Sequence, residues 1–457
     1  MIETLNANPN TEQMRKHKLF AALMCLFAAM FFARKVLGVN FPVVLFLVLA
    51  VIIALVSSRE ELIALVVSFV PFSVGFQYKY AILLCILIYI LKFYKSIKYP
   101  KYAMVVVALF LWEMLHGFSG DFSLYEVLRS FAELIFLAVL LMSDDFDFSD
   151  FLPVKTLVYC SGMAVLIVMC VSLKDYGYDI VLFVERGIRF GVANKDILNF
   201  GFNYNVNGLG SICNAGIAGI LLLLSNKKAH ILDYISASIL LLVGLMTVSR
   251  SFVLCFVGMI VLYFFIQPGS RKKKLTTIFA VAIAIIILLL VINMVIPQVL
   301  ENLSARFEVE DITNGRLDLF AFYNMHIFSD WKYFLFGVGM QNYGSKVNKI
   351  HNTDWNVSHN GFQETVVIWG IVGLALLICL IGTMIKRAKK YGGDKNLIKY
   401  LPFICELVTV MSGQLFTSGN TMLIFMFAFV CMCSGVRAEK KVQVGSGYNE
   451  DRDSNSI

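Results

Sequence analysis

Apolar runs close to twenty residues long recur along almost the whole chain. An α-helix needs a run of about 20 residues to cross the hydrocarbon core of a bilayer. In the 457-residue sequence 59% of the residues are hydrophobic and 15% are charged, whereas soluble proteins carry about 25% charged residues. The sequence therefore predicts an all-α, polytopic integral membrane protein.

Hydropathy predicts about 14 membrane-spanning helices, with 12 or 13 as the alternative count. The predicted segments are 18–35, 40–57, 60–76, 80–96, 102–118, 124–142, 155–173, 206–225, 230–248, 250–267, 275–297, 362–385, 396–414 and 418–435. Residues 18–436 then form one transmembrane domain. A short tail at 1–17 precedes it, and a polar tail at 437–457, expected to be disordered, follows it.

Lysine and arginine clusters indicate which helix ends face the cytoplasm, because such residues are enriched on the cytoplasmic side. If the N-terminal "RKHK" lies inside, alternation through the predicted helices places the later basic clusters inside too. These clusters are at 92–101, 226–228, 270–274, 386–395 and 437–441. Arg34 and Lys35 are the main exception to the pattern. Both termini are therefore predicted in the cytoplasm, and the two long connections, 174–205 and 298–360, outside.

The net charge of +8 follows from these cytoplasmic clusters, so no nucleic-acid partner is expected. Within the larger outer connection, residues 314–330 have apolar side chains at helical spacing, at Leu317, Phe320, Ala321 and Phe328. They predict an amphipathic helix, either on the membrane surface or across the mouth of a cavity. The glycines that follow, in "YFLFGVGMQNYG", predict a tight turn.

Four arginines on the predicted outer side are candidates for binding an anion, because basic residues there oppose the usual distribution. They are Arg186, Arg189, Arg250 and Arg316. For Arg250 the alternative is a short-loop arginine whose side chain reaches the lipid headgroups. For Arg186 and Arg189 it is a solvated loop, in which Asn207 and its neighbouring asparagines form turns and cap the next helix.

His359 and Asn360 stand directly before the apolar segment 362–385. Asn360 is a candidate N-cap, and an isolated histidine at this position can also be an interfacial residue without a chemical role. Together with outer arginines, which bind phosphate as two-pronged donors, His359 could accept a proton from a hydroxyl near neutral pH. These are the groups needed to move a substituent from a phosphate leaving group to an alcohol. Glu364, one turn later, is a candidate to orient His359 or the hydroxyl.

Charged residues also occur inside predicted membrane segments. Glu126, Arg129 and Glu133 share one face of a predicted helix. That spacing predicts a structural ladder of ion pairs.

The order of the motifs between about residues 186 and 373 resembles the bacterial superfamily of O-antigen ligases and polymerases, with its WaaL-like ligases and Wzy-type polymerases. The matching pieces are "RFGVANKD" and "NYNVNGLG" (189–210), "SRSFVL" (249–254), "GRLDLF" (315–320), "FGVGMQNY" (336–343) and "HNGFQETVVIWGIVG" (359–373). The resemblance implies a GT-C-like fold, the polytopic helical architecture of glycosyltransferases that use lipid-phosphosugars, with a large helical outer loop.

The resemblance also implies an inverting, metal-independent enzyme without a cofactor, whose donor is an undecaprenyl-diphosphate-linked glycan. Arg250 and Arg316 would bind the diphosphate and His359 would be the general base. The enzyme would lie in the bacterial cytoplasmic membrane with its active site on the outer face. Its partners would be a lipid-linked donor and acceptor, membrane lipid and a chain-length regulator protein.

Three functions stay open at this point. A polysaccharide polymerase would transfer the growing glycan onto the next lipid-linked repeat unit. The large number of membrane-spanning helices predicted for this chain favours a polymerase. An O-antigen ligase would transfer finished glycan to lipid A core or another acceptor by the same chemistry. A flippase or transporter should instead show charges along several helices and a repeat between its halves, and the sequence has neither.

Overall fold

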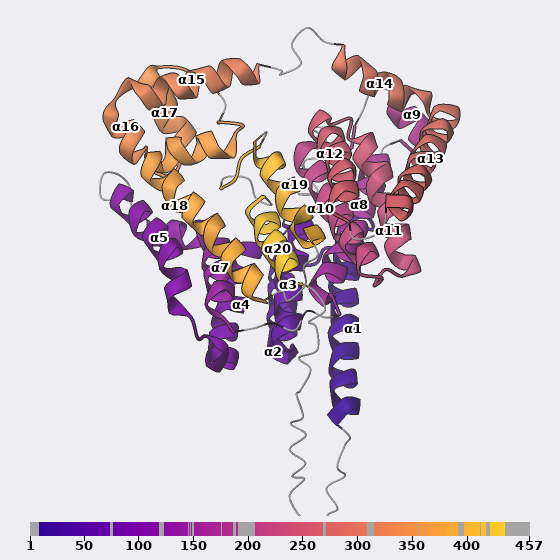
Figure 1. Ribbon diagram of the computed structural model, residues 1–457, viewed down its shortest axis with the longest axis horizontal. Helices are drawn as coiled ribbons and strands as arrows, with labels where there is room; N and C mark the ends of the chain where they lie inside the picture. The colour runs from indigo at the N-terminus through magenta and orange to yellow at the C-terminus, as the bar shows by residue number, and fades with distance from the viewer. Residues whose placement is uncertain are drawn as a thin grey trace, which may run out of the picture.

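The computed structural model describes most of the chain as a bundle of α-helices (Figure 1). The described residues are 9–73, 76–117, 123–144, 146, 148, 150–174, 176–185, 189–190, 206–267, 271–308, 315–355, 357–391, 397–411, 413–416 and 421–434. Within these ranges the only β-type pairing is an isolated bridge between Ile97 and Ser143. The all-α prediction is confirmed.

The helices follow one another through short connections in most of the described chain. Those of the N-terminal part are α1 (Pro9–Lys35), α2 (Val43–Val56), α3 (Arg59–Phe72), α4 (Tyr78–Phe93), α5 (Met104–Gly117), α6 (Leu124–Ser130), α7 (Ala132–Met142), α8 (Leu152–Lys174) and α9 (Ile180–Glu185). Those of the C-terminal part are α10 (Val206–Ser225), α11 (Ile231–Met246), α12 (Arg250–Ile266), α13 (Arg271–Val295), α14 (Pro297–Phe307), α15 (Arg316–Ser329), α16 (Trp331–Phe336), α17 (Tyr343–His351), α18 (Gly361–Tyr391), α19 (Leu401–Val410) and α20 (Thr421–Cys433). Three short 3₁₀ turns accompany them at Tyr94–Ser96, Pro100–Ala103 and Leu397–Tyr400.

Every segment predicted from hydropathy contains a helix, and 124–142 is divided into α6 and α7. Among the described residues, four helices are long and apolar enough to cross a membrane by length and composition. They are His17–Lys35, Leu152–Lys174, Val206–Ser225 and Gly361–Lys390. The chain is a helical membrane protein, and the number of crossings stays a prediction.

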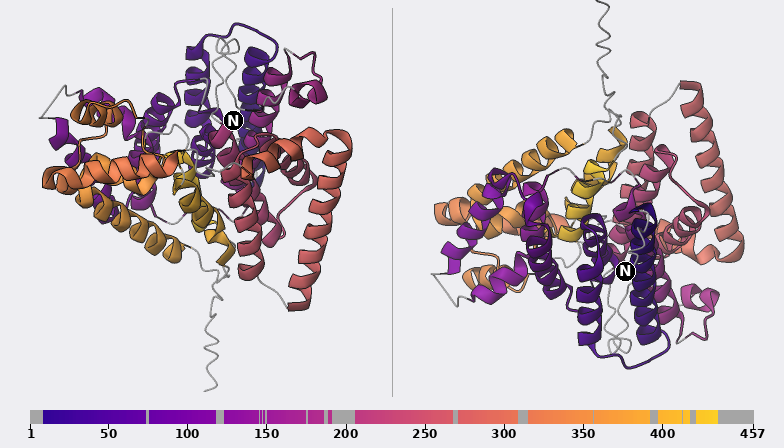
Figure 2. Two further views of the ribbon diagram at one scale, coloured as in Figure 1. Left: turned by 90° about the horizontal axis from the view of Figure 1, so that it is seen from above. Right: turned by 90° about the horizontal axis from the view of Figure 1, so that it is seen from below.

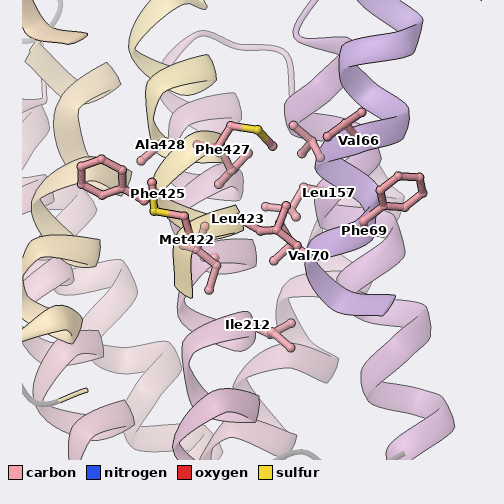
Figure 3. Packing of buried hydrophobic residues seen from close by; sticks show 14 of the residues in the cluster. Val66, Phe69, Val70, Leu157, Ile212, Met422, Leu423, Phe425, Phe427 and Ala428 are labelled. Atoms are coloured by element: carbon pink, nitrogen blue, oxygen red, sulfur yellow. The ribbon is translucent and has the colours of Figure 1, made fainter. Parts of the chain in front are cut away.

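The centre of the bundle is the packing of α3, α8, α10 and α20. Every residue of α20 is buried, and α3 packs along α8 while α10 packs against both α8 and α20. Figure 3 shows Phe69 and Val70 of α3, Leu157 of α8 and Leu423 of α20 in this core. Helices that are apolar on all sides belong in such a position, because no face needs to meet water.

The two ends of the bundle differ in what they carry. Helices α14 to α17 lie at one end, which we call the loop end, and α1 begins at the other (Figure 1). Seen from above, α14 and α15 extend to opposite sides of the bundle (Figure 2). Helix α18 starts near α15 and runs to the opposite end, where its last turns carry Lys386, Arg387, Lys389 and Lys390. We call that end the basic end.

Helix α18 is broken at Gly370, whose φ of 67° and ψ of −169° are not helical. Helix α16 packs against this break. A Cβ at Gly370 would lie 2.1 Å from the carbonyl oxygen of Leu335, so only glycine lets the two backbones approach this closely. Gly337 and Gly339 also have positive φ and form the predicted turn directly after α16.

Backbone groups freed by the break find new partners. The amide nitrogen of Val338 donates to Val367 O at 2.9 Å, and that of Gly339 donates to Ile368 O at 2.8 Å. From α5, Trp112 Nε1 donates to Trp369 O at 3.0 Å. Irregular backbone at membrane depth is tolerated when protein groups satisfy it in this way.

Glu113 of α5 completes this junction. Its carboxylate accepts hydrogen bonds from the Met340 amide at 3.0 Å and from Trp369 Nε1 at 2.6 Å. The side chain is buried and joins α5, the glycine turn and α18. Its contacts give it a structural role.

The predicted ladder of Glu126, Arg129 and Glu133 is wrong. Helix α6 ends at Ser130 and α7 begins at Ala132, which interrupts the common face. Glu133 instead accepts a hydrogen bond from the Tyr78 hydroxyl at 3.0 Å and lies 3.6 Å from Lys79 Nζ, both on α4.

Candidate active site at the loop end

Three helix starts converge at the loop end, and each carries a predicted site residue. Arg250 is the first residue of α12, Arg316 the first of α15, and His359 lies two residues before α18. Burial and the positive charge of Arg250 lower the pKa of Arg316. Burial and the charge of Arg316 lower the pKa of His359. The charge of Arg250 thus acts on Arg316 and that of Arg316 acts on His359, which places Arg316 between the other two in this chain of effects.

Helix ends add to the positive potential of this cluster. The N-terminus of a helix carries about half a positive charge from the aligned peptide dipoles. Arg250 and Arg316 stand in the first turn of their helices, where an anion, not a cation, is the favoured neighbour. Two arginines at two helix N-termini form a region suited to bind an anion such as a diphosphate.

The start of α12 is held by a small hydroxyl network. The Ser249 side chain accepts a hydrogen bond from the Phe252 amide at 3.4 Å and caps the helix. The hydroxyls of Ser249 and Ser251 donate to Asn207 Oδ1 at 2.9 and 3.1 Å. Asn207 lies in the first turn of α10, so it ties the start of α10 to the residues on either side of Arg250.

Arg316 follows Gly315, whose φ of 72° is left-handed. The chain turns there into α15, which buries Leu319, Phe322 and Tyr323 against its surroundings. The predicted helix is confirmed, but it has apolar residues on two faces, and the side that it buries is not the predicted apolar stripe. Leu317, Phe320 and Phe328 are exposed.

Asn360 is the predicted N-cap of α18. Its Oδ1 accepts hydrogen bonds from the amides of Phe362 at 3.1 Å and Gln363 at 3.0 Å. Its Nδ2 donates to Met411 O at 3.1 Å, just after α19. Asn360 therefore determines where α18 begins, and with it the position of the half-buried His359.

Gln363 connects α18 to α15 and was not among the sequence-based candidates. Its Nε2 donates to Phe320 O at 2.7 Å and to Asn324 Oδ1 at 2.9 Å. Its Oε1 accepts from the Ser358 hydroxyl at 2.9 Å. The buried amide thus holds α15, which carries Arg316, beside the segment that carries His359. The only sequence signal was a glutamine in the first turn of an apolar helix.

Glu364 takes part in a different contact from the one expected. Its carboxylate accepts hydrogen bonds from the amides of Leu415 at 2.6 Å and Phe416 at 3.1 Å. Burial and the charge of Glu364 raise the pKa of Tyr323 to about 12. Glu364 therefore holds the segment after α19, and an orienting role toward His359 stays a prediction.

Arg189 precedes Phe190, which contacts the end of α11. The Phe190 amide donates to Met246 O at 3.3 Å, at the end of α11, and its ring stacks on Phe183 at 4.9 Å. Arg186 lies outside the described residues, as do Asn203 and Asn205. In the described part of the chain, no three histidine, cysteine or acidic side chains are arranged to hold a metal ion.

Residues 235–378 match the family model described as O-antigen ligase. This match covers less than half of the 457-residue chain and supports its relation to the O-antigen ligase/polymerase superfamily. The match runs from α11 into α18 and includes Arg250, Arg316 and His359. No curated protein matches the chain.

Members of this superfamily are glycosyltransferase-like membrane enzymes, so the cluster at the loop end can be considered as a site for group transfer. Arginines can hold a diphosphate and offset the negative charge that grows on it as a bond to it breaks. A histidine whose pKa lies below its ordinary 6.5 is neutral at neutral pH and can accept a proton. The chemistry needs the arginines and the histidine within one site. Arg316 connects them, because its charge acts on His359 while that of Arg250 acts on Arg316.

Proposed function

We propose that this superfamily member is a polysaccharide polymerase. It would transfer an undecaprenyl-diphosphate-linked glycan onto the terminal sugar of a lipid-linked repeat unit. The observation that carries the proposal is the position of Arg316, whose charge acts on His359 while that of Arg250 acts on Arg316. A candidate base and candidate diphosphate ligands are thereby neighbours.

In the proposed reaction, a hydroxyl oxygen of the acceptor sugar attacks the anomeric carbon of the donor glycan. The new glycosidic bond forms as the bond between that carbon and the diphosphate oxygen breaks, and the configuration inverts. Undecaprenyl diphosphate leaves with the electron pair of the broken bond. Arg250 and Arg316, with Arg189 and Arg186 as further candidates, neutralise the leaving group, and no cofactor takes part.

His359 takes the proton of the attacking hydroxyl. An imidazole must be neutral to do so, and the lowered pKa of His359 keeps it neutral over the physiological range. Binding of an anionic diphosphate at Arg316 would offset the charge that lowers this pKa. The imidazole would then become a stronger base when the donor is in place.

We further propose that the protein lies in the bacterial cytoplasmic membrane with both termini inside and this site on the outer face. Basic residues at 386–390 lie at the end of the bundle opposite to the candidate site, which agrees with the tendency of such residues to stay in the cytoplasm. An outer site would also meet lipid-linked substrates that have been moved across the membrane.

A ligase is the second candidate, favoured by the description of the family that matches residues 235–378. It would use the same donor and the same residues, with lipid A core or another molecule as acceptor. The polymerase is our first choice because of the number of helices in the N-terminal half.

The test is turnover by the purified protein in detergent, with an undecaprenyl-diphosphate-linked oligosaccharide as the only glycan substrate. A polymerase releases undecaprenyl diphosphate and makes longer lipid-linked glycans. A ligase leaves the donor length unchanged until a separate acceptor is added. Absence of any turnover with either acceptor would support a transporter and contradict the proposal.

A further inference from the structure

The corner between α15 and α16 exposes large apolar side chains. Phe328, near the end of α15, is 72% exposed and Trp331, the first residue of α16, is 62% exposed. Phe336 at the end of α16 is exposed as well. Exposed aromatic residues gathered in one place mark an interaction surface.

This surface is separate from the face that holds the loop end together. Helix α15 packs inward through Leu319, Phe322, Tyr323 and Ile327, all of them buried. Phe328 stacks on Phe334 at 5.7 Å, which links the exposed ends of α15 and α16. The exposed aromatics are therefore a second apolar face, distinct from the one through which α15 packs inward.

The depth of α16 along α18 indicates what covers this face. A helix of about 20 residues crosses a hydrocarbon core. With Lys386 at the boundary of the hydrocarbon layer nearest the basic end, the opposite boundary lies near Val366. Gly370 then lies about 6 Å inside that boundary, at about 1.5 Å per residue. Since α16 packs on the break at Gly370, its exposed side chains stand at the edge of the hydrocarbon layer, not above it.

The same face continues onto a predicted membrane-spanning helix. The ring of Phe336 stacks on Trp112 of α5 at 5.7 Å and lies 6.1 Å from the ring of Trp331. On α5 the neighbouring Leu111 and Leu115 are exposed too. The aromatic corner is thus continuous with an apolar surface of the kind that faces lipid.

The composition of the corner is also typical of a membrane interface. Tryptophan is enriched where acyl chains meet headgroups, because its ring is apolar and its N–H is polar. The exposed Lys332 stands beside Trp331 and can reach toward anionic headgroups.

We propose that the α15–α16 corner is inserted in the lipid interface at the loop end, with Phe328, Trp331 and Phe336 in contact with membrane lipid. The large connection before α18 is then anchored to the bilayer at its far corner as well as to the bundle. The inference depends on the chain being a membrane protein and is independent of the proposed function.

The test uses tryptophan emission from the full chain in vesicles of phosphatidylcholine and phosphatidylglycerol. Phosphatidylcholine brominated near its headgroup quenches only tryptophans in contact with lipid. The chain has four tryptophans, so the contribution of each is obtained by subtraction after substitution. Trp331→Phe is compared with Trp355→Phe, because Trp355 belongs to the same unit, is 41% exposed and stacks on Phe322.

We expect Trp331→Phe to remove a large part of the lipid-quenched emission and Trp355→Phe to remove none of it. Equal quenching of the two residues would contradict the proposal. Quenching of Trp331 by aqueous acrylamide but not by brominated lipid would show that the corner faces water. Protection of Trp331 from both quenchers would show a protein partner instead of lipid. Unchanged elution of both variants in gel filtration establishes that they are folded.

Discussion

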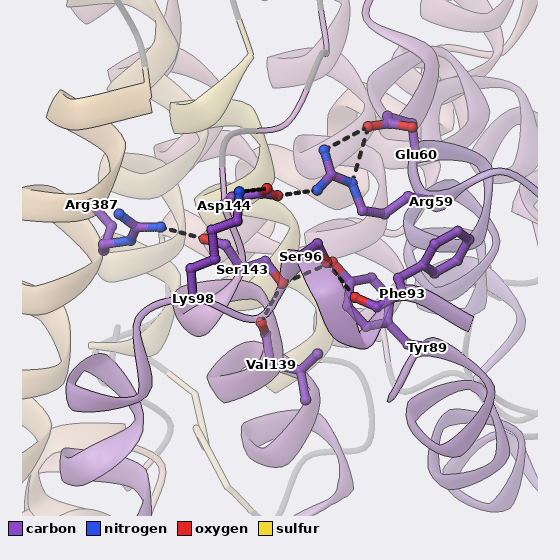
Figure 4. Close-up of polar contacts among 10 residues, drawn as sticks. All are labelled: Arg59, Glu60, Tyr89, Phe93, Ser96, Lys98, Val139, Ser143, Asp144 and Arg387. Carbon is purple, nitrogen blue, oxygen red and sulfur yellow. Dashed lines mark hydrogen bonds and ion pairs between the residues drawn. The ribbon is translucent and has the colours of Figure 1, made fainter. Parts of the chain in front are cut away.

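The two ends of the bundle differ in the charged neighbours that shift the pKa values of their residues. At the basic end cations are paired with acids: Arg59 contacts Asp144, Lys98 Nζ lies 2.9 Å from the same carboxylate, and Arg59 Nη2 lies 3.2 Å from Glu60 (Figure 4). Burial raises the pKa of Asp144, but hydrogen bonds and charges from Lys98 and Arg59 outweigh it and leave the pKa below its ordinary value. These groups stabilise one another.

Arg387, also at the basic end, contacts a backbone carbonyl and two aromatic rings. It is fully buried, donates to Ser143 O at 2.5 Å (Figure 4), and its guanidinium lies 4.6 Å from the ring centre of Tyr99 and 4.7 Å from that of Tyr102. At the loop end, by contrast, Arg250 acts on Arg316 and Arg316 acts on His359, and each pKa falls. A cation beside a carboxylate stabilises the fold, and cations that lie near one another at a helix N-terminus are suited to an anionic ligand.

The largest effect should come from removing a cation at the loop end. Arg316→Met and Arg250→Met should each lower kcat for glycan transfer by about 10²–10³-fold, the loss typical for one group that stabilises transition-state charge. Lys98→Met is the matched control, since it removes a 56% exposed cation from the paired cluster at the basic end. The measurement is release of undecaprenyl diphosphate by equal amounts of purified protein.

The predicted difference between the two ends would be contradicted if Lys98→Met slowed glycan transfer as much as Arg316→Met. It would also be contradicted if both loop-end variants kept the wild-type rate, because the two arginines would then have no part in the transition state.

A smaller loss is expected for Gln363→Met, which keeps the length of the side chain but removes both hydrogen bonds to α15. Arg316 would move relative to His359, and displacements of about 1 Å can cost up to about 10²-fold in rate. The acid limb of the pH–rate profile should shift upward as well, because Arg316 moves away from the imidazole. Ser358→Ala keeps the bonds from Gln363 Nε2 to Phe320 and Asn324 and should have a smaller effect on both.

A lower rate of Gln363→Met with an unmoved acid limb would assign Gln363 a purely structural role. The position of Arg316 would then be determined by other contacts of α15.

The pH dependence of transfer tests the coupling of Arg316 to His359. The base must be neutral, so activity should fall as the pH decreases through the pKa of His359, which lies below 6.5 because of burial and Arg316. In the residual activity of Arg316→Met that limb should move to higher pH, since one cause of the lowering is gone. An acid limb at the same pH in both proteins would contradict the coupling.

The smallest effect is expected for the stability of the loop end in mild acid. His326 is buried, and its Nδ1 lies 2.9 Å from His351 Nε2. Burial and His351 lower its pKa from 6.5 to about 4. As the pH falls, His326 therefore takes up a proton in the unfolded state at a higher pH than in the folded state. Its contribution to the free energy of unfolding is complete above pH 6.5 and is lost as the pH falls toward 4.

Hydrogen exchange at pH 7 and pH 5, corrected for the intrinsic rates, measures this effect. Protection of α15 and α17 should fall at pH 5, and that of α10 should not. Equal protection of α15 at both pH values would mean that His326 does not titrate as a buried group.

Local features of this chain could be predicted from its sequence. Apolar runs identify the helices, and the cap at Asn360 depends on residues within one turn. Arg250 and Arg316 could be singled out because cations are unusual in outer segments of a membrane protein, and His359 because it stands directly before an apolar segment.

Contacts between distant segments could not be predicted. Gln363 meets Phe320 across 43 positions, and Glu133 meets Tyr78 across 55, so no local pattern indicates either contact. Helix α15 has apolar residues on two faces, and periodicity alone does not tell which one is buried. The break at Gly370 depends on the approach of Leu335, which the continuous apolar run around it conceals.

The most direct test of the account is glycan transfer by purified His359→Ala. We predict a loss of about 10²–10⁴-fold, the contribution typical of a general base, while His230→Ala, which removes an exposed histidine before α11, keeps the wild-type rate. Extension of the lipid-linked glycan by His359→Ala at the wild-type rate would contradict the central claim that the loop-end cluster is the site of transfer.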